Sequence, residues 1–359
     1  FQDNIISKHS LIEDLVNKSK ITLNYINYFD SFGRIVTEEL NTGCYNEILN
    51  EYDYDLNDLV IENRIGGDNQ GNFLQYLNYK YNNANMLTHI NFDNLNDNDL
   101  FDMEIGYDLP IEILDNPNAI VNPGDYLRNG NISAVHVKYT TNSNYIFEFE
   151  YDYLSRILAA EYSDVDNIGQ NLIRNNKYST SYSYNAIGNI TSLNRAGIVN
   201  SNFESIDDLS FSYTNNILKN VDDLSGNVKG FNENSSIDYT YDLNGNLTSN
   251  LDSKLSTVQY NFLNLPSLFI KDEGPNSQVE IAPIYTATGE KVVEKRVYYI
   301  YNSNPPTLPY CEEKLYIENL QLQRGCHLDL ELKFLNLKNC QLNINSTFST
   351  FDCSTLQAN

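Results

Sequence analysis

Residues 239–247 read Tyr-Thr-Tyr-Asp-Leu-Asn-Gly-Asn-Leu, and residues 182–190 read Tyr-Ser-Tyr-Asn-Ala-Ile-Gly-Asn-Ile. In both, an aromatic residue is followed by Asp or Asn, a small polar turn, and an aliphatic residue six positions after the aromatic. Tyr-x-Tyr places two rings on one strand face, because side chains alternate with a period of two. Asn and Gly tolerate the positive φ of a tight reversal. Each stretch therefore predicts a β-hairpin in which Leu247 or Ile190 returns as the cross-strand neighbour of the second tyrosine.

Looser copies of this phrase recur along most of the chain, about 19 to 33 residues apart, a spacing that is typical of repeat arrays. A single hairpin is marginally stable in water, so neighbouring hairpins must join into one continuous sheet. The sequence therefore predicts an all-β fold, a repetitive antiparallel β-hairpin sheet that forms a curled strip. The aromatic anchors of the copies are Phe29, Tyr54, Tyr81, Tyr107, Tyr126, Tyr151, Tyr184, Tyr213, Tyr241, Phe262 and Tyr285.

The phrases also resemble a known family, the RHS/YD-repeat proteins, in particular their long forms of the Bacteroidetes type. The resemblance covers about residues 25 to 301 and is carried by five stretches, 182–190, 238–247, 260–266, 99–104 and 129–133. It implies a partial hollow β-shell that encloses and delivers a C-terminal effector, usually a toxin that acts against competing bacteria. The partners implied are the remainder of the shell and an encapsulated effector.

Four segments follow from the pattern. Residues 1–24 are predicted to be a degenerate repeat or a linker, with a short helix within 8–20 as the weaker alternative. Residues 25–301 form the repeat array, residues 302–310 a proline-rich linker, and residues 311–359 a small C-terminal appendage that is not another repeat.

The appendage holds four of the five cysteines. None of their spacings is Cys-x-x-Cys, which argues against a zinc site. Two alternatives stay open: two disulfides in any of three connectivities in an oxidising compartment, or free thiols. The four cysteines are Cys311, Cys326, Cys340 and Cys353, and the odd Cys44 is expected to stay free.

The charge balance favours some partners over others. The chain carries 23 Lys and Arg against 48 Asp and Glu, a net charge of −25. Nucleic acid and anionic membrane surfaces would be repelled. No apolar run is long enough to span a membrane, and we expect a secreted or cell-surface protein whose signal lies in an upstream segment.

A search for catalytic or metal-binding motifs finds none. The four histidines lie in unrelated contexts, and His136 in an alternating run is expected to be a structural or an exposed strand residue rather than a catalytic base. Asp242-x-Asn244-x-Asn246 mimics the start of a calcium loop but lacks its distal Glu, so turn chemistry is favoured. The remaining histidines are His9, His89 and His327. No cofactor, metal site or enzymatic activity is predicted.

Two further segments are candidate sites. Residues 93–104 are acidic and are expected to form an exposed, Asn-rich loop, with a calcium site as the alternative. Residues 66–72 are expected to be a hairpin tip. The Asp-Pro-x-Gly stretch that RHS proteins link to self-cleavage is missing, since no proline follows an aspartate, so self-cleavage is not expected.

Two functions from different classes remain. The resemblance implies a non-enzymatic structural module, part of a shell around an effector. The alternative is a secreted or cell-surface binding protein that recognises glycans or proteins. A third and weaker interpretation gives enzymatic activity to about the last 57 residues.

Overall fold

The computed structural model is all-β: every regular element in the described residues is a strand. Among the residues that the structure describes, no helix is long and apolar enough to cross a membrane. The predicted all-β fold is thus confirmed. The structure describes residues 4–14, 19–41, 46–67, 71–91, 99–107, 111–112, 120–121, 130–140, 143–166, 172–231, 239–301, 310–317, 320–325, 331–336 and 341–347.

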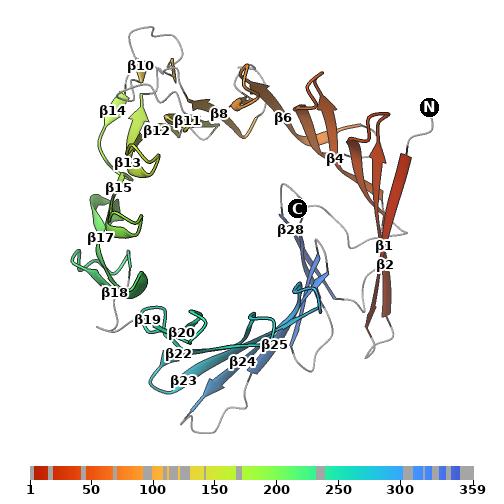
Figure 1. Ribbon diagram of the computed structural model, residues 1–359. Coiled ribbons are helices and arrows are strands. Elements are labelled where there is room, and N and C mark those ends of the chain that lie inside the picture. Colours follow the sequence, from red (N-terminus) through yellow and green to blue (C-terminus); the bar gives the residue numbers. More distant parts are fainter. Residues whose placement is uncertain are drawn as a thin grey trace. The chain divides into compact units, whose positions relative to one another are not determined.

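The first sheet has 16 strands whose neighbours are antiparallel and mostly consecutive in sequence (Figure 1). Only β14 lies off the path, paired with β13. The expected degenerate start of the chain is a hairpin of β1 and β2, which excludes the helical alternative there. The strands are β1 (Asn4–Asp14), β2 (Ser19–Phe29), β3 (Ile35–Asn41), β4 (Asn46–Tyr54), β5 (Val60–Gly67), β6 (Phe73–Tyr81), β7 (Leu87–Ile90), β8 (Phe101–Gly106), β11 (Ala134–Tyr139), β12 (Asn144–Tyr151), β13 (Ile157–Val165), β14 (Leu172–Arg174), β15 (Thr180–Tyr184), β16 (Ile190–Val199), β17 (Asn202–Thr214) and β18 (Ile217–Asp223).

The second sheet has 10 strands in sequence order, and a separate pair joins β9 (Ile111–Glu112) and β10 (Ile120–Val121). Each of the two large sheets is a row of described strands that follow one another almost in sequence order, as the hairpin repeat predicts. The prediction of one continuous sheet is corrected, because the array divides between β18 and β19. The second sheet holds β19 (Tyr239–Tyr241), β20 (Leu247–Asn250), β21 (Leu255–Tyr260), β22 (Pro266–Gly274), β23 (Ser277–Tyr285), β24 (Lys291–Ile300), β25 (Tyr310–Ile317), β26 (Leu320–Gly325), β27 (Glu331–Asn336) and β28 (Gln341–Thr347).

The expected separate C-terminal unit also needs correction. Strand β25 pairs with β24, with Tyr310 opposite Tyr298, and β26 to β28 follow in order. The described strands after residue 303 therefore continue the sheet. The prolines that suggested a boundary, within 305–309, lie outside the described residues.

The repeated turn explains why each phrase folds as a hairpin. The Asp242 carboxylate accepts hydrogen bonds from the amides of Asn244 (2.9 Å) and Asn246 (2.8 Å), and the Asp242 amide donates to the Asn246 carbonyl at 2.9 Å. Gly245 takes a positive φ of 82°. Tyr241 lies opposite Leu247, so the predicted register is confirmed. Equivalent Asx turns begin at Asn82, Asp152, Asn185 and Asn261.

The best-buried part of the first sheet lies around β11, β12 and β13. Ala134, Ile146 and Val165 form a small apolar cluster, against which Leu172 of β14 packs. His136 of β11 is also buried, with 2% of its surface exposed.

Candidate functional site

Neighbouring hairpins are joined by the hydroxyl groups of the anchor tyrosines. The Tyr54 hydroxyl donates a 2.6 Å hydrogen bond to the carbonyl of Ile35, the sixth residue after the preceding anchor, Phe29. The Tyr54 ring thus holds the start of the return strand of the hairpin before it. The same bond joins Tyr81 to Val60, Tyr107 to Leu87, Tyr151 to Ile132, Tyr184 to Ile157, Tyr213 to Ile190 and Tyr260 to Leu247, at 2.7 to 2.9 Å.

Cationic side chains reinforce several of these junctions. The Arg156 guanidinium lies 4.6 Å from the centre of the Tyr184 ring and donates to the Asn185 carbonyl at 3.2 Å. Arg34 lies at the same 4.6 Å from the Tyr54 ring. Such contacts fix the lateral register of adjacent hairpins.

The predicted anchors need two adjustments. Phe262 is 94% exposed at the tip of a turn, and the anchor of that repeat is Tyr260, which lies opposite Pro266. Tyr316 of β25, which is not among the predicted anchors, also contacts the hairpin before it: its ring lies 4.3 Å from the ammonium group of Lys291, the sixth residue after Tyr285. Tyr126 lies outside the described residues.

A chain of seven aromatic rings crosses one face of the first sheet, from β8 to β17. At its centre Tyr145 stacks on Tyr162 with ring centres 5.5 Å apart, and Phe147 meets Tyr162 edge-on at 5.3 Å. Tyr178 continues the row at 5.1 Å from Tyr162. The outer members are Phe101, Tyr139 and Phe203.

A carboxylate is held beside these rings. Asp164 accepts hydrogen bonds from the Tyr162 hydroxyl and from the Asn175 amide, both at 2.7 Å, and forms an ion pair with Lys177. These donors hold the pKa of Asp164 below its usual value although burial opposes them. Burial, then the bond to the Asp164 carboxylate, raises the pKa of Tyr162. The result is an ionised carboxylate, paired with Lys177, at the edge of an aromatic surface.

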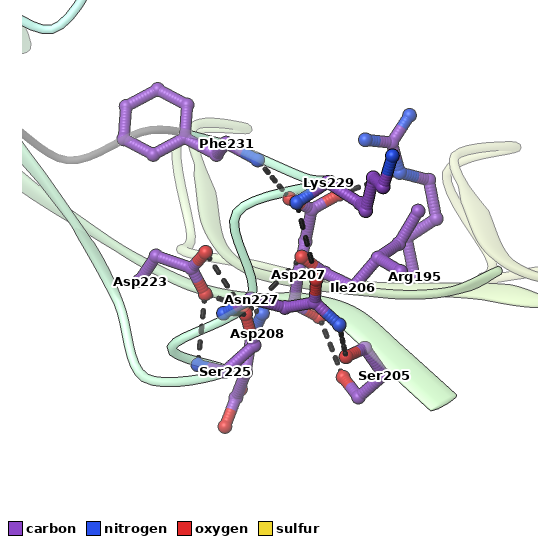
Figure 2. Close-up of polar contacts among 10 residues, drawn as sticks. All are labelled: Arg195, Ser205, Ile206, Asp207, Asp208, Asp223, Ser225, Asn227, Lys229 and Phe231. Atoms are coloured by element: carbon purple, nitrogen blue, oxygen red, sulfur yellow. Dashed lines mark hydrogen bonds and ion pairs between the residues drawn. The ribbon is translucent and has the colours of Figure 1, made fainter. Parts of the chain in front are cut away.

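A second polar cluster forms where the first sheet ends, in residues 224–231, which we name the clasp. Figure 2 shows the clasp against the N-terminal half of β17, whose other edge pairs with β16. Ser225 donates to the Ile206 carbonyl at 3.1 Å, and Asn227 to the Ser205 carbonyl at 3.3 Å. Side chains thus take the place of a neighbouring strand and cover this edge.

Asp207 anchors the clasp. Its side chain is 2% exposed and accepts hydrogen bonds from Arg195 Nε and from the Phe231 amide, both at 2.5 Å (Figure 2). A Cβ added at Gly230 would lie 1.8 Å from the Ile206 carbonyl oxygen. The close backbone approach therefore requires glycine at this position.

The histidines form no metal centre in the part of the chain that the structure describes. His136 is hydrogen-bonded through Nε2 to Asn144 Oδ1 at 2.6 Å, and burial lowers its pKa. Glu104 lies between His89 (3.8 Å) and His136 (4.0 Å) on adjacent strands. No group of three or more potential ligands suited to a metal ion occurs among the described residues. His9 lies on β1, and His327 is outside the described residues.

The other predicted positions divide between strands and turns. Residues 93–104 were expected to form an exposed loop, but Asp102 and Glu104 belong to strand β8 and Asp99 is only 8% exposed. The prediction is therefore wrong for the end of this segment, and residues 92–98 lie outside the described residues. Gly66 and Gly67 end β5, which pairs antiparallel with β6, and Gly71 just before β6 has a φ of 82°. The centre of the predicted hairpin tip, residues 68–70, lies outside the described residues.

The cysteines are only partly described. Cys311 on β25 is disulfide-bonded. Its partner cysteine lies outside the described residues. Cys44, which was expected to stay free, lies outside them too, as do Cys326, Cys340 and Cys353.

The aromatic row and the clasp were missed by sequence reasoning. The alternation of Tyr145, Phe147 and Phe149 signals an aromatic strand face, but nothing local indicates that Tyr162 and Tyr178 join it. Asp207 and Gly230 carry no motif. Both features depend on long-range pairing.

No family model and no curated protein sequence matches this chain. Similar solved structures exist, all with low sequence identity. The crystal structure of TcdB2-TccC3 without its hypervariable C-terminal region matches 99% of the chain with a TM-score of 0.62 and 14% identity. That of TcdB2-TccC3-Cdc42 matches 95% with a TM-score of 0.60 and 12% identity, and a Photorhabdus luminescens Tc holotoxin pore matches 96% with a TM-score of 0.51 and 12% identity.

The chain spans only 17 to 18% of the length of these similar chains. At such identities the likeness concerns the fold alone. Membership of the Bacteroidetes-type family stays a prediction. The β-hairpin strip of this chain is an RHS-type β-fold.

Proposed function

We propose that the chain is a non-enzymatic structural module, part of a β-shell that encloses and delivers an effector. The observation that carries the proposal is the hydrogen bond that each of seven anchor tyrosines makes to the hairpin before it. An array held by nearest-neighbour contacts extends by addition, which suits a large container wall. The fold likeness to TcdB2-TccC3 complexes supports the same function.

Export to the cell surface or the medium belongs to this proposal. The disulfide of Cys311 supports it, because structural disulfides persist in oxidising compartments. The alternative, a binding protein for glycans or proteins, is supported by the aromatic row on β12 and β13.

A protection experiment tests the shell proposal. The chain is produced within the full shell polypeptide together with the effector polypeptide, and the product is treated with a broad-specificity protease. We expect the effector polypeptide to survive much longer than when it is produced alone. Equal digestion of the two preparations would contradict enclosure. A matched sample carrying Asp207→Asn, which weakens the clasp, should show intermediate protection.

A further inference from the structure

An open groove of about 820 Å³ lies along the central rings of the aromatic row. Its walls include Tyr145, Phe147, Tyr162 and Tyr178. Small-molecule sites typically have volumes of roughly 300 to 1,000 Å³ and combine aromatic walls with a few polar groups. The groove therefore has the size and the lining of a ligand site.

The charge of the groove selects among ligands. Asp164 and Asp166, at the end of β13, line the same groove as the rings. The chain as a whole carries a net charge of −25. Anionic ligands are repelled by this field and cationic ligands are concentrated near it.

An ammonium group of the protein itself already lies beside this groove. Lys177 Nζ forms an ion pair with Asp164 and lies 4.9 Å from the centre of the Phe203 ring. The Phe203 ring in turn meets the groove residue Tyr178 at 6.1 Å. One carboxylate and one ring thus stabilise a cation at the rim, while the other rings face the open groove.

We propose that this groove binds an organic cation of the quaternary-ammonium class, carried on a larger molecule. Aromatic faces are electron-rich and attract cations within about 6 Å, and recognition of quaternary ammonium by several rings is a well-known use of this attraction. The weak hydration of such a cation lowers the cost of its transfer into an aromatic groove. This ligand site is independent of the shell proposal, since it needs only β12, β13 and residues 172–178.

The test compares two ligands of equal shape. The first ligand is choline, and the second is 3,3-dimethyl-1-butanol, in which carbon replaces the charged nitrogen. Each ligand is titrated into the full chain, and binding is measured by calorimetry and by saturation-transfer NMR. We expect saturable binding of choline and binding of the neutral analogue weaker by about tenfold. Absent choline binding, or equal binding of both ligands, overturns the proposal.

Variants locate the site. Tyr178→Leu should reduce choline binding severalfold and Tyr178→Phe should restore it, because the attraction requires the ring and not the hydroxyl. Tyr301→Leu, at a 48% exposed ring on the second sheet, is the matched control and should bind choline normally. Lys177→Met should strengthen binding, since it removes the internal cation from Asp164. Unchanged binding in Tyr178→Leu with a retained thermal midpoint overturns the assignment.

One more measurement separates two sources of the same chemistry. Sedimentation of the protein with phosphatidylcholine vesicles, lost in Tyr178→Leu, identifies a lipid headgroup as the ligand. Choline binding without sedimentation identifies a free organic cation. Both outcomes support the cation site, whereas sedimentation that persists in Tyr178→Leu contradicts its role in lipid binding.

Discussion

The Tyr151→Phe substitution isolates the tyrosine hydroxyl that joins two hairpins. It removes one 2.7 Å hydrogen bond, from Tyr151 to the carbonyl of Ile132, and keeps the ring. A net contribution of about 1 kcal/mol is typical of such a bond. Seven equivalent bonds occur among the described residues, so together they contribute about 7 kcal/mol, a large part of the roughly 5 to 15 kcal/mol that stabilises a typical domain.

Urea denaturation followed by far-ultraviolet circular dichroism measures the free energy of unfolding. The matched control is Tyr153→Phe, which removes a hydroxyl from a ring that is 91% exposed at the tip of the same hairpin. We expect Tyr153→Phe to change the free energy of unfolding by less than about 0.5 kcal/mol, and Tyr151→Phe to lower it by about 1 kcal/mol. If the two variants unfold at the same urea concentration, the junction hydroxyls do not hold the array together.

Three further predictions concern the clasp, a buried histidine and the disulfide. Gly230→Ala should lower the free energy of unfolding by about 1 to 3 kcal/mol, because the new Cβ would meet the Ile206 carbonyl, whereas Gly274→Ala, with open space around it, should change it by under about 0.5 kcal/mol in the same urea assay. Burial lowers the pKa of His136 in the folded state, so below about pH 6.5 protons bind preferentially to the unfolded chain. The free energy of unfolding of the wild type, relative to that of His136→Asn, should therefore fall as the pH is lowered from 7.5 to 5.5. An unchanged difference would show that His136 protonates freely in the fold. A reducing agent should lower the thermal midpoint of the wild type but not that of Cys311→Ser, and equal shifts in both would place the relevant disulfide elsewhere.

Local turn chemistry explains why much of the fold could be predicted from the sequence. Tyr241 and Leu247 meet as expected, since Asp242 and Gly245 determine the turn between them within a few residues. Every hairpin repeats the same local rule, and so the all-β strip follows from the phrase alone. The sixth-position contact needed no knowledge of the rest of the chain.

The errors have local causes as well. Pro266 occupies the sixth position after Tyr260, so the rule of an aliphatic residue there favoured Phe262 instead. Proline is tolerated at the first residue of a strand, and Pro266 begins β22. The prolines near residue 305 were interpreted as a domain boundary, but pairing resumes at Tyr310.

The candidate sites could not be predicted, because they depend on contacts between residues far apart in the sequence. Tyr162 meets Tyr145 across a strand pair and Tyr178 through a connecting segment. Their convergence on Asp164 is set by the register of β12 against β13, which no single phrase encodes. The short phrases specify hairpins, and the sheet then specifies the site.

The clasp covers a strand edge that the hairpin array leaves open. A strand edge left open offers unpaired backbone groups to any further hairpin. Along the N-terminal half of β17 the carbonyls of Ile206 and Ser205 accept hydrogen bonds from Ser225 and Asn227. Asp207 holds the clasp by accepting a hydrogen bond from the Phe231 amide, and it also pairs with Arg195 of β16. No further strand can pair with that edge while the clasp is in place. The clasp therefore covers the part of β17 that extends beyond its pairing with β18, whereas the two sheets divide between β18 and β19 and not at the proline-rich segment near residue 305.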